Sequence, residues 1–202
     1  MKVLMINGSP HAQGNTSIAL QEMEKIFIQE GIETEVLHVG NQDIRGCIAC
    51  HSCMKNGKCV FNDSVNEAAE KFRQCDGLVV ASPVYYASAN ATLIAFLDRL
   101  FYSTSFDKTM KVGASVVVAR RGGLSATFDE LNKYFTICGM PVASSQYWNS
   151  VHGRLPGEAA PGNAEWTADH AHAGKKYVLS HEEYCSWKRE IRTSGKGTAA
   201  AY

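Results

Sequence analysis

Five short apolar segments alternate with helical patterns along the chain, and this alternation constrains the fold more than any other feature. The predicted strands span residues 3–6, 34–39, 77–82, 111–119 and 142–146. Between them apolar residues recur at helical spacing, as at Ala19, Met23 and Phe27. A chain that alternates strands with helices builds a parallel sheet with helices on both faces. The sequence therefore predicts an α/β three-layer sandwich with a five-stranded parallel sheet.

Length and composition predict one domain. The 202 residues suffice for a single well-packed core, which we expect to span 1–190. A surface loop is predicted at 147–162, a helix at 163–190 and a loosely ordered tail at 191–202.

Charge and hydropathy exclude several classes of protein. The 20 basic residues balance 20 acidic ones, which argues against binding to nucleic acid or to a membrane surface. No apolar run approaches the length of a membrane span, and the apolar run at 3–6 is too short for a signal peptide. Four of the seven cysteines fall within 13 positions, a pattern typical of reduced thiols or metal ligands. We therefore expect a soluble, cytoplasmic protein.

Three polar or glycine-containing loops follow predicted strands, at 8–17, 82–90 and 120–124. The carboxyl ends of parallel strands share one edge of the sheet, here called the rim. Ligands of open α/β sheets bind at this edge. The three loops are therefore expected to form one composite site.

The first loop, GSPHAQGNTS at 8–17, leads from a strand into a helix. Backbone N–H groups and the positive end of a helix dipole then meet at one point, which favours a phosphate. The side chains that could bind it are Ser9, His11, Asn15, Thr16 and Ser17. The loop matches neither a Walker A motif nor GxGxxG, so the expected ligand is a phosphate monoester. The alternative is an ordinary turn whose polar residues only cap the helix.

The other two loops suit a flavin ring. Tyr85 and Tyr86, beside Pro83, offer flat surfaces for stacking. The third loop offers glycine N–H groups and an arginine that can stabilise a negatively charged ring edge. These residues are Arg120 or Arg121, Gly122 and Gly123. Together the three loops predict a flavin mononucleotide (FMN) pocket; alternatively, the tyrosines pack on a helix or a partner subunit.

These motifs resemble the flavodoxin-like NADPH-dependent FMN reductases, especially their iron-sulfur-flavoprotein branch. The resemblance covers roughly residues 1–150. It is carried by GSPHAQGNTS at 8–17, SPVYY at 82–86, RRGG at 120–123, Leu-x-x-Phe-Leu-Asp-Arg at 93–99, and cysteines 47, 50, 53 and 59. It implies a flavodoxin-like domain, FMN as cofactor, NAD(P)H as donor, and a homodimer or homotetramer.

The resemblance also implies roles for individual residues. The phosphate would be held by Ser9, His11, Asn15, Thr16 and Ser17. The flavin would be lined by Pro83, Val84, Tyr85 and Tyr86, and its pyrimidine side by Arg120, Gly122 and Gly123. No side chain is predicted to be catalytic, because the flavin itself carries the chemistry.

The cysteine spacing Cys-x2-Cys-x2-Cys-x5-Cys allows three interpretations. Cys47, Cys50, Cys53 and Cys59 could each bind one iron of a [4Fe-4S] cluster. Zinc is an alternative, although its structural sites usually pair two CxxC elements across a longer gap. The third interpretation is a metal-free loop with free thiols, and the resemblance leaves this open because the branch carries these cysteines with and without iron.

The predicted function is an FMN-dependent oxidoreductase that takes electrons from NAD(P)H. The acceptor would be a quinone, an azo compound, a free flavin or a protein. One alternative is an iron-sulfur flavoprotein that carries electrons through a [4Fe-4S] cluster. A second is a non-catalytic flavodoxin-like binding module with Tyr85, Tyr86 and Trp148 as interface anchors. The sequence leaves open the physiological acceptor and the choice between NADH and NADPH.

Overall fold

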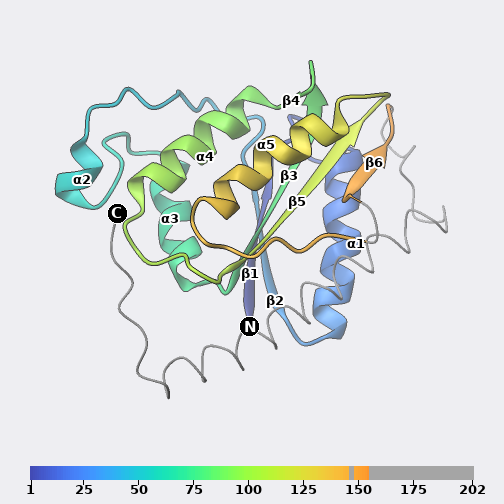
Figure 1. The fold of residues 1–202 in the computed structure, drawn as a ribbon, viewed down its shortest axis with the longest axis horizontal. Helices are drawn as coiled ribbons and strands as arrows, with labels where there is room; N and C mark the ends of the chain where they lie inside the picture. The colour runs from blue at the N-terminus through green and yellow to red at the C-terminus, as the bar shows by residue number, and fades with distance from the viewer. Residues whose placement is uncertain (146–147, 155–202) are drawn as a thin grey trace.

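The computed structural model describes residues 1–145 and 148–154 (Figure 1). Helices and strands alternate along the chain as predicted. In order, they are β1 (Lys2–Asn7), α1 (Asn15–Gln29), β2 (Glu33–His38), α2 (Ser52–Asn56), α3 (Ser64–Gln74), β3 (Gly77–Tyr85), β4 (Ser88–Ala89), α4 (Ala91–Ser103), β5 (Val112–Ala119), α5 (Leu124–Thr136) and β6 (Ser150–His152).

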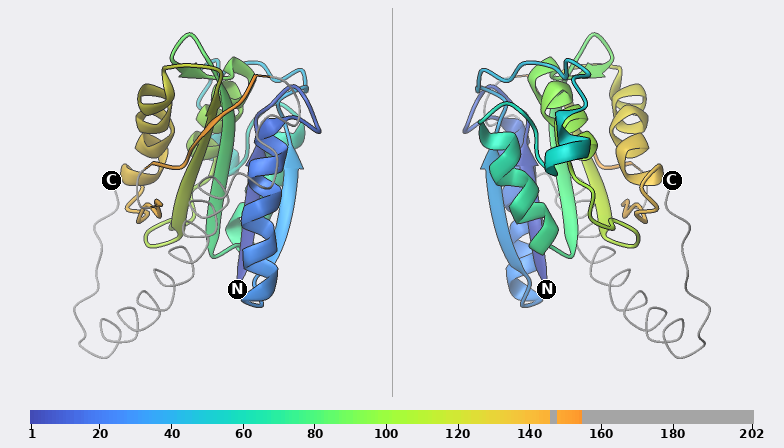
Figure 2. Two further views of the ribbon diagram at one scale, coloured as in Figure 1. Left: turned by 90° about the vertical axis from the view of Figure 1, so that its right-hand side faces the viewer. Right: turned by 90° about the vertical axis from the view of Figure 1, so that its left-hand side faces the viewer.

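The strands form a sheet in the order β2-β1-β3-β5-β6, with every neighbouring pair parallel. The short β4 pairs antiparallel with the end of β3. Helix α1 covers one face of the sheet, and α3, α4 and α5 cover the other (Figure 2). The predicted three-layer sandwich with a five-stranded parallel sheet is thus confirmed.

Burial on both faces explains why the central strands are continuously apolar. Along β1, Leu4 and Ile6 pack under α3 and α4, whereas Val3 and Met5 pack under α1. Successive side chains of a strand point to opposite faces, so both sets are buried. All eight residues of β5 are likewise buried. These strands give the rim a rigid base.

The predicted strand at 142–146 is wrong. Val142 forms only an isolated bridge with Gly113, and Gln146 lies outside the described residues. The strand that extends the sheet is β6, within the segment predicted to be a surface loop. Asn149 explains the shift, because its backbone C=O accepts a hydrogen bond from Val117 N–H at 2.9 Å. Its buried side chain accepts another from Ser145 N–H, also at 2.9 Å.

Two small elements are absent from the sequence predictions. Helix α2 interrupts the long connection at 40–62, and β4 makes a hairpin with β3. The predictions of a helix at 163–190 and a tail at 191–202 fall outside the described residues. No helix in the ranges 1–145 and 148–154 is long and apolar enough to cross a membrane.

Candidate functional site: a cavity at the rim and a cysteine pocket

The first loop is shaped by hydrogen bonds to its own residues and to β3. Gly8 N–H donates to Ala81 C=O at 2.8 Å, which ties the end of β1 to the neighbouring strand. Ser9 N–H donates to the buried Asn7 Oδ1 at 3.0 Å. His11 N–H in turn donates to Ser9 Oγ at 3.1 Å. The loop backbone is therefore positioned before any ligand binds.

Contacts distant in sequence hold the other side of this loop. Asn90 Nδ2 donates to Gly8 C=O at 2.7 Å and to Gly40 C=O at 3.3 Å. The His38 ring nitrogen Nε2 lies 2.6 Å from Ser9 C=O. A Cβ atom added to Gly40 would lie 2.2 Å from that same carbonyl oxygen, so only glycine allows the two segments to approach. The ends of β1 and β2 and the start of α4 thus form one rigid unit.

Two helices begin at the rim without a capping side chain. Among the residues that the structure describes, no side chain caps α1 or α5, whose N-cap residues are Gly14 and Gly123. By contrast, Asp63 caps α3 and Asn90 caps α4. Neither α1 nor α5 has an acidic residue in its first turn. Their positive ends are therefore suited to an anionic ligand.

The three loops meet around one cavity of about 440 Å³, here called the rim cavity. It is lined by Ser9, His11, Gly14, Asn15, Thr16, Pro83, Val84, Tyr85, Val118, Ala119, Arg120, Gly153 and Arg154. This volume lies within the range typical of small-molecule and cofactor sites. The structure thus brings together residues predicted for both the phosphate and the flavin ring.

Four predicted site residues do not line this cavity in the described part of the chain: Ser17, Tyr86, Gly122 and Gly123. Ser17 lies in the first turn of α1, where its Oγ accepts a hydrogen bond from Gln21 Nε2 at 3.5 Å. Gly122 is exposed beside Arg121. These positions are part of the three loops without facing the cavity.

The hairpin formed by β3 and β4 explains where Tyr86 and Gly123 lie. Tyr86 and Ala87 form the tip between β3 and β4, both with positive φ, and the Tyr86 side chain is fully exposed. Gly123 also has a positive φ of 87°, and an added Cβ would lie 2.8 Å from Ala87 Cα. The third loop therefore packs against the hairpin. Of the two tyrosines, only Tyr85 reaches the cavity.

Sequence reasoning missed several residues of this site. Gly153 and Arg154 line the cavity because they follow β6, the strand that was misplaced. Asn7 and Asn90 position the loop from buried sites. The signal for Asn90 was its place just before a helical pattern, where asparagine is a favoured N-cap. Its bonds to Gly8 and Gly40 leave no local sequence signal.

The donor chemistry of the rim cavity fits FMN. The uncapped start of α1, with the buried Ser9 and Thr16, offers N–H and hydroxyl donors of the kind that bind a phosphate. Gly14 lines the cavity there, and an added Cβ would lie 3.3 Å from His11 Cβ, tighter than an ordinary contact. Val84 and Tyr85 supply apolar and aromatic surface for a ring, and Arg120 and Arg154 supply positive charge.

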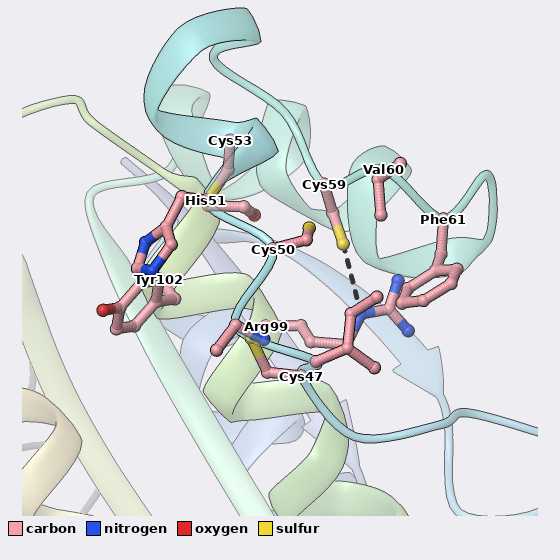
Figure 3. A pocket seen from close by; sticks show the side chains of 12 residues that line it. Cys47, Cys50, His51, Cys53, Cys59, Val60, Phe61, Arg99 and Tyr102 are labelled. Atoms are coloured by element: carbon pink, nitrogen blue, oxygen red, sulfur yellow. Dashed lines mark hydrogen bonds between the residues drawn. The ribbon is translucent and has the colours of Figure 1, made fainter.

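The four predicted metal ligands line a second, separate pocket, here called the cysteine pocket (Figure 3). Cys47, Cys50, Cys53 and Cys59 are free thiols, and the first two are exposed. Within residues 1–145 and 148–154, no three or more His, Cys, Asp or Glu side chains are placed to hold one metal ion. In a cubane cluster each thiolate binds a different iron, so the four sulfurs need not converge on one point.

The arginine of the 93–99 motif anchors this pocket from α4. Arg99 is 1% exposed, and its two Nη atoms donate to the Asp63 carboxylate at 2.7 and 2.8 Å. Its Nε donates to Cys59 Sγ at 3.3 Å (Figure 3), and its guanidinium lies 4.9 Å from the Phe61 ring centroid. Desolvation on burial opposes the charged form, but the bonds to Asp63 and Cys59 leave the Arg99 pKa raised. One buried cation therefore joins the cysteine loop to α3 and α4.

Comparisons with known proteins agree with this geometry. A family model described as NADPH-dependent FMN reductase matches residues 1–154. The chain is similar to an iron-sulfur flavoprotein of Methanocaldococcus jannaschii, with 34% identity over 166 residues that cover 78% of this chain and 86% of that protein. It is also 34% identical to an iron-sulfur flavoprotein of Methanosarcina thermophila over 146 residues, 70% of this chain and 76% of that protein.

Among solved structures, the apo form of an NADH:FMN oxidoreductase is similar, with a TM-score of 0.64. The comparison covers 89% of each chain at 19% sequence identity. At this identity the likeness shows the fold alone, which is flavodoxin-like.

Proposed function

The chain belongs to the NADPH-dependent FMN reductase family and is therefore an FMN-dependent oxidoreductase. We propose that it transfers electrons from NAD(P)H to a quinone, an azo compound, a flavin or a protein acceptor. One observation carries the proposal: loops at 8–17, 82–90 and 120–124 enclose one cavity whose donor chemistry suits FMN. When bound, FMN supplies the hydride and electron-transfer chemistry.

The protein residues bind and orient the cofactor. The first-turn N–H groups of α1, with Ser9 and Thr16, hold the phosphate. Val84 and Tyr85 form the wall beside the ring, and Arg120 and Arg154 stabilise negative charge at the cavity's edge. Ser17, Tyr86, Gly122 and Gly123 remain candidates for contacts with FMN at the margin of the cavity. His11 also lines it and is the one ionisable group in the first loop.

A second candidate is electron transfer through a [4Fe-4S] cluster bound by Cys47, Cys50, Cys53 and Cys59. The observation in its favour is that all four thiols line one pocket next to an N–H donor from Arg99. N–H bonds to thiolate sulfur are a feature of iron-sulfur sites. Similarity to proteins named iron-sulfur flavoproteins adds support.

Anaerobic purification followed by cofactor analysis tests both proposals. We expect flavin absorption bands with FMN bound, and oxidation of NADH or NADPH when a quinone is supplied. A protein that stays colourless and does not bind added FMN would contradict the proposed function and favour a binding module. Iron and sulfide analysis of the same sample decides the second candidate separately. Light scattering would test the expected homodimer or homotetramer.

A further inference from the structure

The hydroxyl of Ser103 is buried without a hydrogen-bond partner. Ser103 is the last residue of α4 and is 4% exposed. In the described part of the chain, its Oγ is the one buried side-chain nitrogen or oxygen without a partner. Buried polar groups are almost always hydrogen-bonded, because an unpaired one costs free energy. An unpaired hydroxyl of this kind points to a ligand that completes the site.

Ser103 lines the cysteine pocket. Arg99 lies four residues earlier on α4, so the two side chains share one face of the helix. Arg99 already donates to Cys59 Sγ. Helix α4 thus brings a charged N–H donor and a hydroxyl donor to the pocket that holds the four thiols.

We propose that the Ser103 hydroxyl donates a hydrogen bond to a sulfur of a [4Fe-4S] cluster held by Cys47, Cys50, Cys53 and Cys59, and that this bond raises the cluster's reduction potential. The inference rests on the proposed cluster. Reduction makes the cluster more negative, so a donor to its sulfur stabilises the reduced form more than the oxidised form. Ser103 is a positioning and tuning residue, distinct from the four ligands.

Tyr102 provides a matched control, because it neighbours Ser103 and lines the same pocket but is 64% exposed. The test compares the parent protein with Ser103→Ala, Ser103→Thr and Tyr102→Phe. Each is reconstituted anaerobically with iron and sulfide, and the cluster is titrated with dithionite while its spectrum is recorded. FMN content is measured in every sample.

We expect Ser103→Ala to shift the reduction potential to a lower value, and Ser103→Thr to return it toward that of the parent. Tyr102→Phe should leave it unchanged, and FMN content should be equal throughout. Loss of iron from Ser103→Ala alone would also support a role of the hydroxyl. Equal potentials in Ser103→Ala and the parent, or loss of iron from both Ser103 variants, would overturn the inference. A parent that forms no cluster would overturn the proposed cluster as well.

Discussion

Thr16 is almost completely buried at the start of α1, yet it lines the rim cavity. If its hydroxyl binds the phosphate, Thr16→Ala should weaken FMN binding by about 1–3 kcal/mol, or roughly 5- to 150-fold in Kd. Quenching of FMN fluorescence during titration measures this change. FMN affinity of Thr16→Ala equal to that of the parent would contradict the assignment of Thr16. Ser17→Ala, which removes a hydroxyl from the same helical turn that does not line the cavity, tests separately whether Ser17 contacts FMN.

Cys75 should behave unlike the cysteines of the pocket. Burial raises the pKa of its thiol to about 11, whereas Cys50 is exposed. At pH 8 only about one Cys75 thiol in a thousand is then ionised. In native, iron-free protein we therefore expect a thiol reagent to modify Cys50 rapidly and Cys75 only on unfolding, as measured by peptide mass spectrometry. Rapid labelling of Cys75 would show that its environment opens readily.

The raised pKa of Cys75 also links stability to pH. The unfolded thiol has the ordinary pKa of 9.0, below that of the folded protein. The neutral thiol is therefore favoured by folding, and its contribution is complete below pH 9. It is lost as the pH rises toward about 11, because the unfolded state then releases its proton first. Urea unfolding of Cys75→Ala should show less of this alkaline decline than the parent.

Among the elements, α4 is bonded at its start to the first loop of the rim cavity. Asn90 Oδ1 accepts a hydrogen bond from Thr92 N–H as the N-cap, while its Nδ2 donates to Gly8 and Gly40. Asn90→Ala removes the cap bond and the bonds to the loop, and it should lower the free energy of unfolding by about 2–3 kcal/mol. Asn90→Asp retains the cap acceptor but loses the donor, so it separates the two roles. Urea unfolding of the apoprotein measures stability, and FMN titration measures the site.

We expect Asn90→Asp to retain more stability than Asn90→Ala but to bind FMN more weakly than the parent. Its carboxylate would face the Gly8 and Gly40 carbonyl oxygens without a proton to donate. FMN affinity equal to that of the parent would show that the loop keeps its shape without this bond.

Helices and strands were predicted correctly where the apolar pattern extends over several residues, and the prediction failed where the element is very short. Strands β1 and β5 have six and eight residues, and they are mostly apolar and buried on both faces. By contrast, β6 has three residues, of which only Val151 is buried. A three-residue strand has too little periodicity to recognise. Its place depends on pairing with β5 and on the hydrogen bonds of Asn149.

At the scale of the whole molecule, cofactor binding should stabilise the fold, since the rim cavity joins segments from both ends of the described chain. FMN at one hundred times its Kd should raise the free energy of unfolding by about 2.7 kcal/mol. Thermal unfolding at several FMN concentrations measures this effect. Riboflavin is the control, because it has the same ring without the phosphate. Equal stabilisation by riboflavin and FMN at the same concentration would contradict a phosphate site at 8–17.

The predictions from sequence were strongest for the order of elements and the location of the site. Patterns among residues close together in the chain indicate the alternation of strands and helices. In a parallel sheet, the loops that follow the strands then lie at the same edge. Residues such as Thr16, Tyr85 and Arg120 could therefore be assigned to one rim cavity before the structure was known. The cysteine spacing raised the possibility that the four thiols bind one cluster, and the structure shows that all four line one pocket.

The amino-acid sequence alone determined the layered α/β architecture and the edge at which the loops meet, because periodicity is a property of residues close together in the chain. Only the tertiary structure decided which loop residues face the cavity, and it added Asn90, Arg154 and Ser103 to the sites. Which residues line the two sites depends on strand register and on contacts between residues far apart in sequence, such as Asn90 with Gly8. No local pattern encodes such contacts, since packing of the complete core selects them.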